Sequence, residues 1–184
     1  IAYIGVNNHE IDLIAPFIEA LKCENVKNSY RLILYGNTIS NEKWNQLGLS
    51  EIAEYRGWLD YSKDVSTLKD IDVFLQLLDD NNVSKAGWPN KLGDYLAFWK
   101  PVILSPYGDI IDFVKNEKGF FIVEYNKYSI LKILQEIKDI PYSDLKTMGY
   151  ANRQLAEKIS WKNRAKNIEY ICNKIRFNNE TVKN

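Results

Sequence analysis

The chain has 184 residues, of which 46% are hydrophobic and 13% aromatic, and this content excludes a disordered protein and allows one full-sized core. Lys and Arg number 24 and Asp and Glu also number 24, so no net charge attracts the whole molecule to nucleic acid or to an anionic membrane. The two cysteines, Cys23 and Cys172, are too few and too far apart for a disulfide framework or a zinc site, which favours a reducing cytoplasm.

The chain opens directly on a predicted strand, without an initiating methionine or a signal peptide, so we expect a domain cut from a longer protein. No apolar run approaches the roughly 18 residues that span a bilayer. Apolar runs then alternate with amphipathic segments, a pattern typical of βαβ units in a parallel sheet. Six strands are predicted, at residues 1–6, 30–36, 52–58, 71–78, 101–105 and 119–125.

Helices are predicted between these strands and after the last one. Apolar residues at helical spacing over 14–21 predict a helix that Pro16 begins or kinks, and further stripes lie at 110–114 and 130–137. Ser160 is a good N-cap for a last helix with an apolar stripe of Trp161, Ala165, Ile168, Cys172 and Ile175. We therefore predict one doubly wound α/β domain over residues 1–176, with a helical C-terminal extension and a polar tail at 177–184.

Ligands of such sheets bind at the carboxyl ends of the strands, where helix N-termini direct free amides outward. The connection after strand 71–78 is long, roughly 10 residues against the usual two to six. It ends at Gly87-Trp88-Pro89-Asn90, where Lys91 adds a positive charge for phosphate at a helix start. Asp94, one turn further on, can accept hydrogen bonds from vicinal hydroxyls; the alternative is a solvated Lys91–Asp94 pair.

The segment WPNKLGDYLAFWKPVILSPYGDIIDFVKNEKGFFIVE resembles the nucleotide-sugar site of family 4-like GT-B glycosyltransferases, the glycosyl transferases of group 1. Their C-terminal domain carries Pro-Ser-Lys, then Glu-Tyr, then Gly-Lys-Pro-Val-Ile before a glycine loop, a short helix and a strand. Other parts resemble the same domain in the same order, and the resemblance covers nearly the whole chain: IAYIGV, YRLILYGN, IAEYRGWLDYSKDVSTLKDIDVFLQL and ISWKNRAKNIEYI.

The resemblance implies a six-stranded Rossmann-like domain, one half of a GT-B fold, that binds the nucleotide sugar. The acceptor-binding half is then an N-terminal domain outside this chain, and the donor is a UDP- or GDP-sugar. The implied reaction moves the sugar to a glycan or a lipid-linked acceptor with retention of configuration, without a metal or another cofactor. A cytoplasmic protein is implied, with peripheral association at the inner face of the membrane left open and no nucleic-acid partner.

By position, the resemblance also implies a set of binding residues. Asp94 matches the glutamate that binds the ribose hydroxyls, and Gly5 matches the glycine of the first loop. The loop and helix start that meet the donor sugar and the diphosphate are Gly87, Trp88, Pro89, Asn90 and Lys91. The residues after the third strand, where the base lodges, are Arg56, Gly57 and Trp58. No catalytic residue is implied.

Several positions depart from the family pattern. The usual diphosphate-binding arginine and lysine are replaced by Val6 and Glu10, a second glutamate by Ala86, and a glycine by Trp99. Two lost cations remove charge-assisted contacts of roughly 1.5–3 kcal/mol each. A degenerate domain with a binding or assembly role is therefore the alternative hypothesis, while a nucleotide-sugar epimerase is disfavoured because no acid/base set is visible.

Two pairs of aspartates and the single histidine are interpreted as structural residues. Asp70 precedes its strand and Asp72 marks the start of it, at the edge of the sheet opposite to the ligand. Asp79 and Asp80 lack the additional oxygen ligands that a metal site needs. His9 is the only histidine and has no partner for nucleophilic catalysis.

Overall fold

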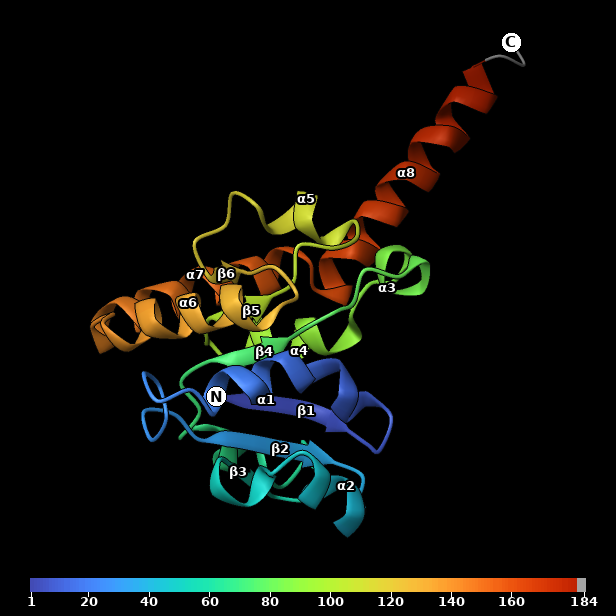
Figure 1. Cartoon of the computed structure of the whole chain (residues 1–184). Coiled ribbons are helices and arrows are strands. Elements are labelled where there is room, and N and C mark those ends of the chain that lie inside the picture. The colour runs from blue at the N-terminus through green and yellow to red at the C-terminus, as the bar shows by residue number, and fades with distance from the viewer. Residues whose placement is uncertain (182–184) are drawn as a thin grey trace.

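The computed structural model describes the backbone of residues 1–181 and the side chains of residues 1–175, and it contains a six-stranded sheet (Figure 1). All pairs are parallel, in the order β3-β2-β1-β4-β5-β6. Each strand lies inside one of the six predicted ranges, and the doubly wound fold is confirmed. The strands are β1 (Ala2–Val6), β2 (Leu32–Gly36), β3 (Ala53–Tyr55), β4 (Phe74–Gln76), β5 (Val102–Leu104) and β6 (Phe120–Ile122).

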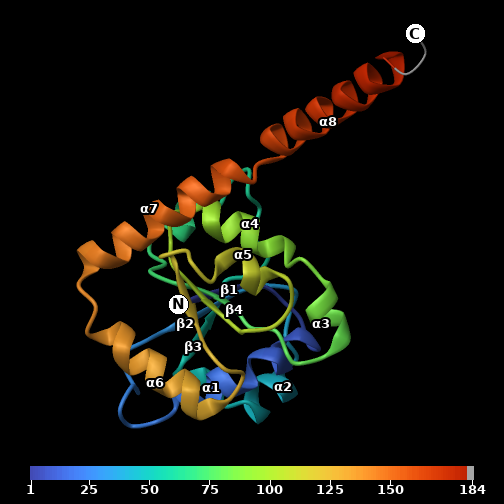
Figure 2. The same cartoon turned by 90° about the horizontal axis from the view of Figure 1, so that it is seen from above.

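Helices cover both faces of this sheet (Figure 2). Helix α1 (Ala15–Leu21) packs with α6 (Lys127–Lys138) on one face, and α4 (Asn90–Ala97) packs with α7 (Tyr142–Lys158) on the other. Pro16 lies in the first turn of α1, where its missing N–H costs nothing. The shorter elements are the helices α2 (Asn41–Gln46), α3 (Asn82–Ala86) and α5 (Ile110–Val114), and the 3-10 helices η1 (Glu10–Ile14), η2 (Leu49–Glu51) and η3 (Val65–Leu68).

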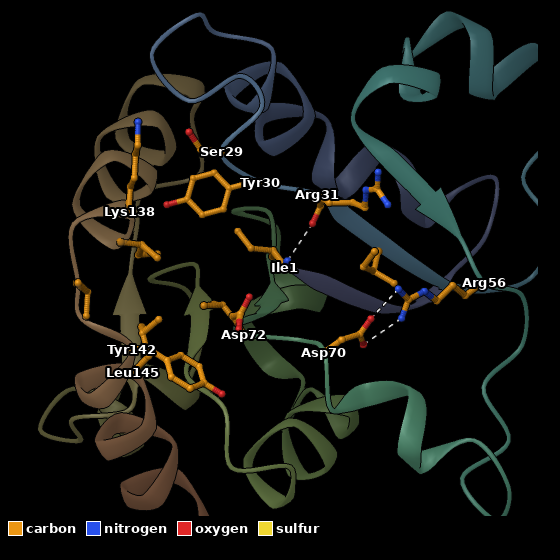
Figure 3. A pocket seen from close by; sticks show the side chains of 14 residues that line it. Ile1, Ser29, Tyr30, Arg31, Arg56, Asp70, Asp72, Lys138, Tyr142 and Leu145 are labelled. Carbon is orange, nitrogen blue, oxygen red and sulfur yellow. Dashed lines mark hydrogen bonds and ion pairs between the residues drawn. The ribbon is translucent and has the colours of Figure 1, made fainter.

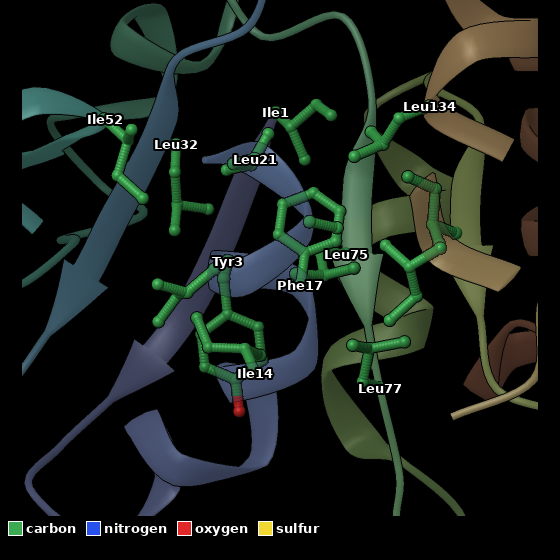
Figure 4. Close-up of a cluster of buried hydrophobic side chains, with 14 of the residues drawn as sticks. Ile1, Tyr3, Ile14, Phe17, Leu21, Leu32, Ile52, Leu75, Leu77 and Leu134 are labelled. Carbon is green, nitrogen blue, oxygen red and sulfur yellow. The ribbon is translucent and has the colours of Figure 1, made fainter. Parts of the chain in front are cut away.

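Alternation along the strands divides the core into two layers. In β1, Tyr3 packs with the layer under α1, while Ala2 and Ile4 pack with the layer under α4. Figure 4 shows the first layer, where Phe17 is fully buried against the sheet. Burying each such side chain stabilises the fold by about 1.5–3 kcal/mol. The order of the strands places the crossover between β1 and β4, and this crossover defines where a ligand is expected.

The connection after β4 contains a short helix, which the sequence interpretation missed. Helix α3 is capped by Asn81, whose side chain accepts a hydrogen bond from the backbone N–H of Ser84 at 2.7 Å. The long connection therefore positions Gly87 at the end of one helix and Asn90 at the start of the next.

The C-terminal helix α8 (Trp161–Thr181) projects away from the domain (Figures 1 and 2). Its predicted cap is confirmed, because the backbone N–H of Asn163 donates to Ser160 Oγ at 3.4 Å. The predicted apolar stripe is exposed to solvent in this chain: Trp161 is 85% exposed and Ile168 61%. The helix continues to Thr181, into the expected polar tail, and residues 182–184 lie outside the described part. Among the described helices, none has the length and apolar content of a membrane span.

Trp99 ends α4 in a left-handed backbone conformation, with φ 60°. Its ring packs against Tyr150, with centroids 4.9 Å apart, and below the Arg153 guanidinium at 5.8 Å. A residue with a Cβ pays about 1–2 kcal/mol in this region, and a glycine does not.

We expect Trp99→Gly to be more stable than Trp99→Ala by about 1 kcal/mol, because both variants lose the ring contacts and only glycine relieves the backbone. Urea unfolding of the two variants measures the difference. Equal stability, or a more stable alanine variant, would contradict a strained backbone at Trp99.

Candidate functional site

The carboxyl end of β1 meets the N-terminus of α4 at the crossover of the sheet. Gly5 has φ 87°, and a Cβ built on it would lie 2.5 Å from Lys91 Cε. The ammonium group of Lys91 lies 3.5 Å from the carbonyl oxygen of Gly5. Only glycine therefore allows both this backbone conformation and the close approach of the lysine. The structure brings together Gly5 and Lys91, as the resemblance implied.

Lys91 is held by an acidic partner. Its Nζ donates to Glu10 Oε2 at 2.9 Å and lies 5.0 Å from the centre of the Tyr3 ring. Burial and the nearby Glu10 carboxylate raise the pKa of Tyr3. Both charged side chains are partly exposed, 30% for Lys91 and 38% for Glu10. The cation is therefore accessible to a ligand but is already neutralised within the chain.

Asp94 lies one turn further along α4. Its Oδ2 accepts a hydrogen bond from the hydroxyl of Tyr61 at 3.0 Å. Tyr61 belongs to the loop between β3 and η3, and its ring stacks near Phe98, with centroids 6.2 Å apart. Burial and the nearby Asp94 carboxylate raise the pKa of Tyr61. The loop after β3 thus contacts α4, and Tyr61 is a site residue that sequence reasoning missed, although its loop was among those expected to face a ligand.

The loop before α4 lines a pocket of about 570 Å³ between α4, α7 and the start of α8. Trp88, Asn90 and Asp94 contribute to its wall. The Trp88 ring meets Phe113 edge-on at 5.3 Å, and the Arg164 guanidinium lies 5.7 Å from it. Pro89 directly precedes α4 rather than entering its first turn, and Gly87 ends α3. Two residues of the implied loop, Trp88 and Asn90, therefore line this pocket together with Asp94.

Arg56 is directed away from this site. Its guanidinium pairs with Glu54 and with Asp70, both at 2.8 Å, and these pairings lower the pKa of both carboxyl groups. Asp70 precedes β4, so the pair lies at the amino-terminal edge of the sheet, beside a pocket of about 470 Å³ (Figure 3). Asp72 lies at this same edge, as its sequence position indicated. The Arg56 side chain is thus separate from the residues around Lys91.

The next two residues do follow β3 at its carboxyl end. Gly57 has φ 75° with open space where a Cβ would be, and Trp58 is 71% exposed. The flat ring of Trp58 is therefore exposed at the position that the resemblance implies for the base.

The structure also shows where the residues that depart from the family pattern lie. Val6 is buried in the core and does not face the site. Ala86 is exposed at the end of α3, and Glu10 forms the pair with Lys91. Within residues 1–181 no three His, Cys, Asp or Glu side chains gather as a metal-binding group.

No family model matches the sequence, and no curated protein matches it. Known structures do match the fold. Sucrose-phosphate synthase from Thermosynechococcus elongatus has 14% identity and a TM-score of 0.71, over 95% of this chain and 45% of that one. Anabaena HepE, in complex with UDP and glucose, has 14% identity and a TM-score of 0.61, over 85% and 42%.

The C-terminal domain of a glycosyl transferase group 1 family protein from Francisella tularensis has 14% identity and a TM-score of 0.61, over 86% of this chain and 83% of that domain. The chain thus spans less than half of the two longer proteins, and nearly the whole of an isolated C-terminal domain. The resemblance seen in the sequence is confirmed at the level of the fold: this chain has the Rossmann-like architecture of the C-terminal domain of a GT-B glycosyltransferase.

Proposed function

We propose that this chain is the donor-binding half of a glycosyltransferase that moves a sugar from a nucleotide-diphosphate sugar to a glycan or lipid-linked acceptor. The observation that carries the proposal is the contact of Lys91 with Gly5 at the crossover between β1 and β4, with Asp94 one turn further along α4. Open α/β sheets bind nucleotides at this place. HepE, which shares the fold, is a protein in complex with UDP and glucose.

Each group has a defined role in the proposal. The amides at the start of α4, together with Lys91, bind the diphosphate, and the Asp94 carboxylate accepts hydrogen bonds from the ribose hydroxyls. The base lies along Gly57 and Trp58, beyond Tyr61. During transfer, the amides and Lys91 stabilise the charge that develops on the departing diphosphate.

The rest of the reaction depends on parts outside this chain. The acceptor and any base that activates it belong to an N-terminal half, and the sugar is transferred with retention and without a metal ion. A cytoplasmic location, at the inner face of the membrane for a lipid-linked acceptor, completes the proposal.

One observation favours a second candidate function, a degenerate domain that binds or assembles without turnover. Glu10 neutralises Lys91, the lysine beside the Gly5 carbonyl oxygen, and neither Val6 nor Ala86 supplies a replacement ligand. A domain that no longer binds a donor has no need to keep its phosphate-binding cation free.

Calorimetric titration of the chain with UDP and GDP separates the two functions. We expect one of them to bind with micromolar to millimolar affinity, and the matching nucleotide sugar to bind in competition with it. Adenosine, which has no phosphate groups, is the control for stacking on exposed tryptophans. Absence of binding by both nucleotides at millimolar concentration would contradict the donor-site proposal and favour the assembly role.

A further inference from the structure

The ion pair between Glu10 and Lys91 carries an inference that rests on the proposed function and extends it. Glu10 begins η1, immediately after the loop that follows β1, and Lys91 is the second residue of α4. Their charged atoms lie 2.9 Å apart, at hydrogen-bonding distance. The carboxylate therefore occupies the position beside the ammonium group that a phosphate oxygen would take.

Glu10 is fixed in this position by more than the lysine. Its backbone N–H donates to the side chain of Asn7 at 2.9 Å, which shapes the turn between β1 and η1. The lysine is fixed as well, because its Nζ lies 5.0 Å from the ring centre of Tyr3, a residue of β1 that is only 1% exposed. The turn held by Asn7 and the lysine beside a buried ring fix both partners, so the pair is a built feature and not a chance contact of two surface side chains.

Two other lysines already have acidic partners. Lys43 is bound to Asp12 at 2.6 Å, and Lys85 is bound to Asp80. A phosphate that binds Lys91 beside Gly5 competes with Glu10 for the same ammonium group and displaces it. Once displaced, the unpaired carboxylate stays within a few ångströms of the phosphate, because its backbone is held by Asn7, and the two negative charges repel.

We propose that Glu10 is a specificity-determining residue of this site, because it competes with phosphate groups for Lys91 and so limits the affinity for charged ligands. The effect grows with the charge of the ligand. Binding of the nucleoside part, at Asp94 and the loop after β3, does not involve Glu10. Glu10 thus sets how much of the total affinity comes from the diphosphate.

The test compares the wild-type chain with Glu10→Gln, which keeps the shape of the side chain and removes its charge. Uridine, UMP and UDP are titrated into both proteins by calorimetry at low salt, and guanosine, GMP and GDP replace them if the site takes GDP. We expect the affinity for the diphosphate to rise about tenfold or more, the size of one charge-assisted contact, with a smaller gain for the monophosphate and none for the nucleoside.

The control variant is Asp12→Asn. Asp12 lies on the same 3-10 helix and forms an ion pair with Lys43, so its loss changes the local charge without touching Lys91. We expect its affinities to equal those of the wild type. Thermal unfolding of both variants checks that the fold is intact.

The outcomes separate this inference from the proposed function. Diphosphate binding that is equal in wild type and Glu10→Gln overturns the inference and leaves the donor-site proposal intact. A gain that is the same for nucleoside and diphosphate also overturns it, since competition for Lys91 cannot affect an uncharged ligand. Absence of binding in both proteins, for both nucleotide series, overturns the donor site and the inference with it.

Discussion

Replacing Lys91 by methionine is expected to lower the affinity for the proposed nucleoside diphosphate ligand by at least about tenfold, and by up to about a hundredfold. The variant removes the cation nearest to the start of α4 and leaves Glu10 without its partner, 38% exposed and facing the ligand. Loss of attraction and gain of repulsion act in the same direction. Methionine replaces the side chain of Lys91 as far as Cε, the atom nearest to Gly5, so the packing below the site is retained.

The matched control is Lys43→Met, which breaks another lysine–carboxylate pair on a helix of the same domain. We expect this variant to bind the nucleotide as the wild type does. Calorimetry with the nucleoside as a second ligand completes the measurement, because Lys91→Met is expected to leave nucleoside binding unchanged. If Lys91→Met binds the diphosphate with wild-type affinity, the phosphate group does not lie at the start of α4.

The second large effect is structural. Gly149 is buried in α7, where this helix crosses the end of α4, and a Cβ on it would lie 1.9 Å from the backbone carbonyl oxygen of Trp99. Backbone cannot rotate away as a side chain does, so Gly149→Ala must separate α7 from α4. We expect this variant to lose about 3 kcal/mol of its free energy of unfolding, the upper range for overpacking. That is a large part of the roughly 5–15 kcal/mol that stabilises a typical domain.

Gly93→Ala is the matched control, since it is the same substitution inside a helix, α4, with no atom within 4 Å of the added Cβ. Alanine is the better helix former, and we expect this variant to gain about 0.5–1 kcal/mol. Urea unfolding of both variants measures the two effects, which should have opposite signs. A destabilisation of Gly149→Ala no greater than about 0.5 kcal/mol would show that the two helices are not in close contact.

The architecture could be predicted because it depends on local patterns. The apolar runs around β2 and β5 are buried on both sides, which is the condition that produces a continuous apolar run in a parallel strand. Ser160 was recognised as a cap because capping needs only the residues next to it. The ends of the strands do not follow from the same pattern, since β3 and β4 are shorter than the apolar runs that contain them.

The site could be predicted only in part, because its contacts join distant segments. The resemblance assigns Gly5 and Lys91 to one site, but their contact, across 86 positions, is seen only in the structure. The hydrogen bond from Tyr61 to Asp94 joins residues 33 positions apart and has no local signal. Arg56 follows a strand at its carboxyl end, but its long side chain reaches back to Asp70, a contact that its position in the sequence does not indicate.

The order of the strands also links binding to folding. Glu10 and Lys91 are 81 positions apart and belong to two halves of the chain, which meet where β1 pairs with β4 and where α1 packs with α6. A ligand that bridges these segments therefore favours the assembled chain over every partly folded form in which the halves have separated. By mass action, such a ligand at a free concentration of about a hundred times its dissociation constant adds about 2.7 kcal/mol to that preference, so the ligand concentration becomes one of the quantities that set the population of the folded domain.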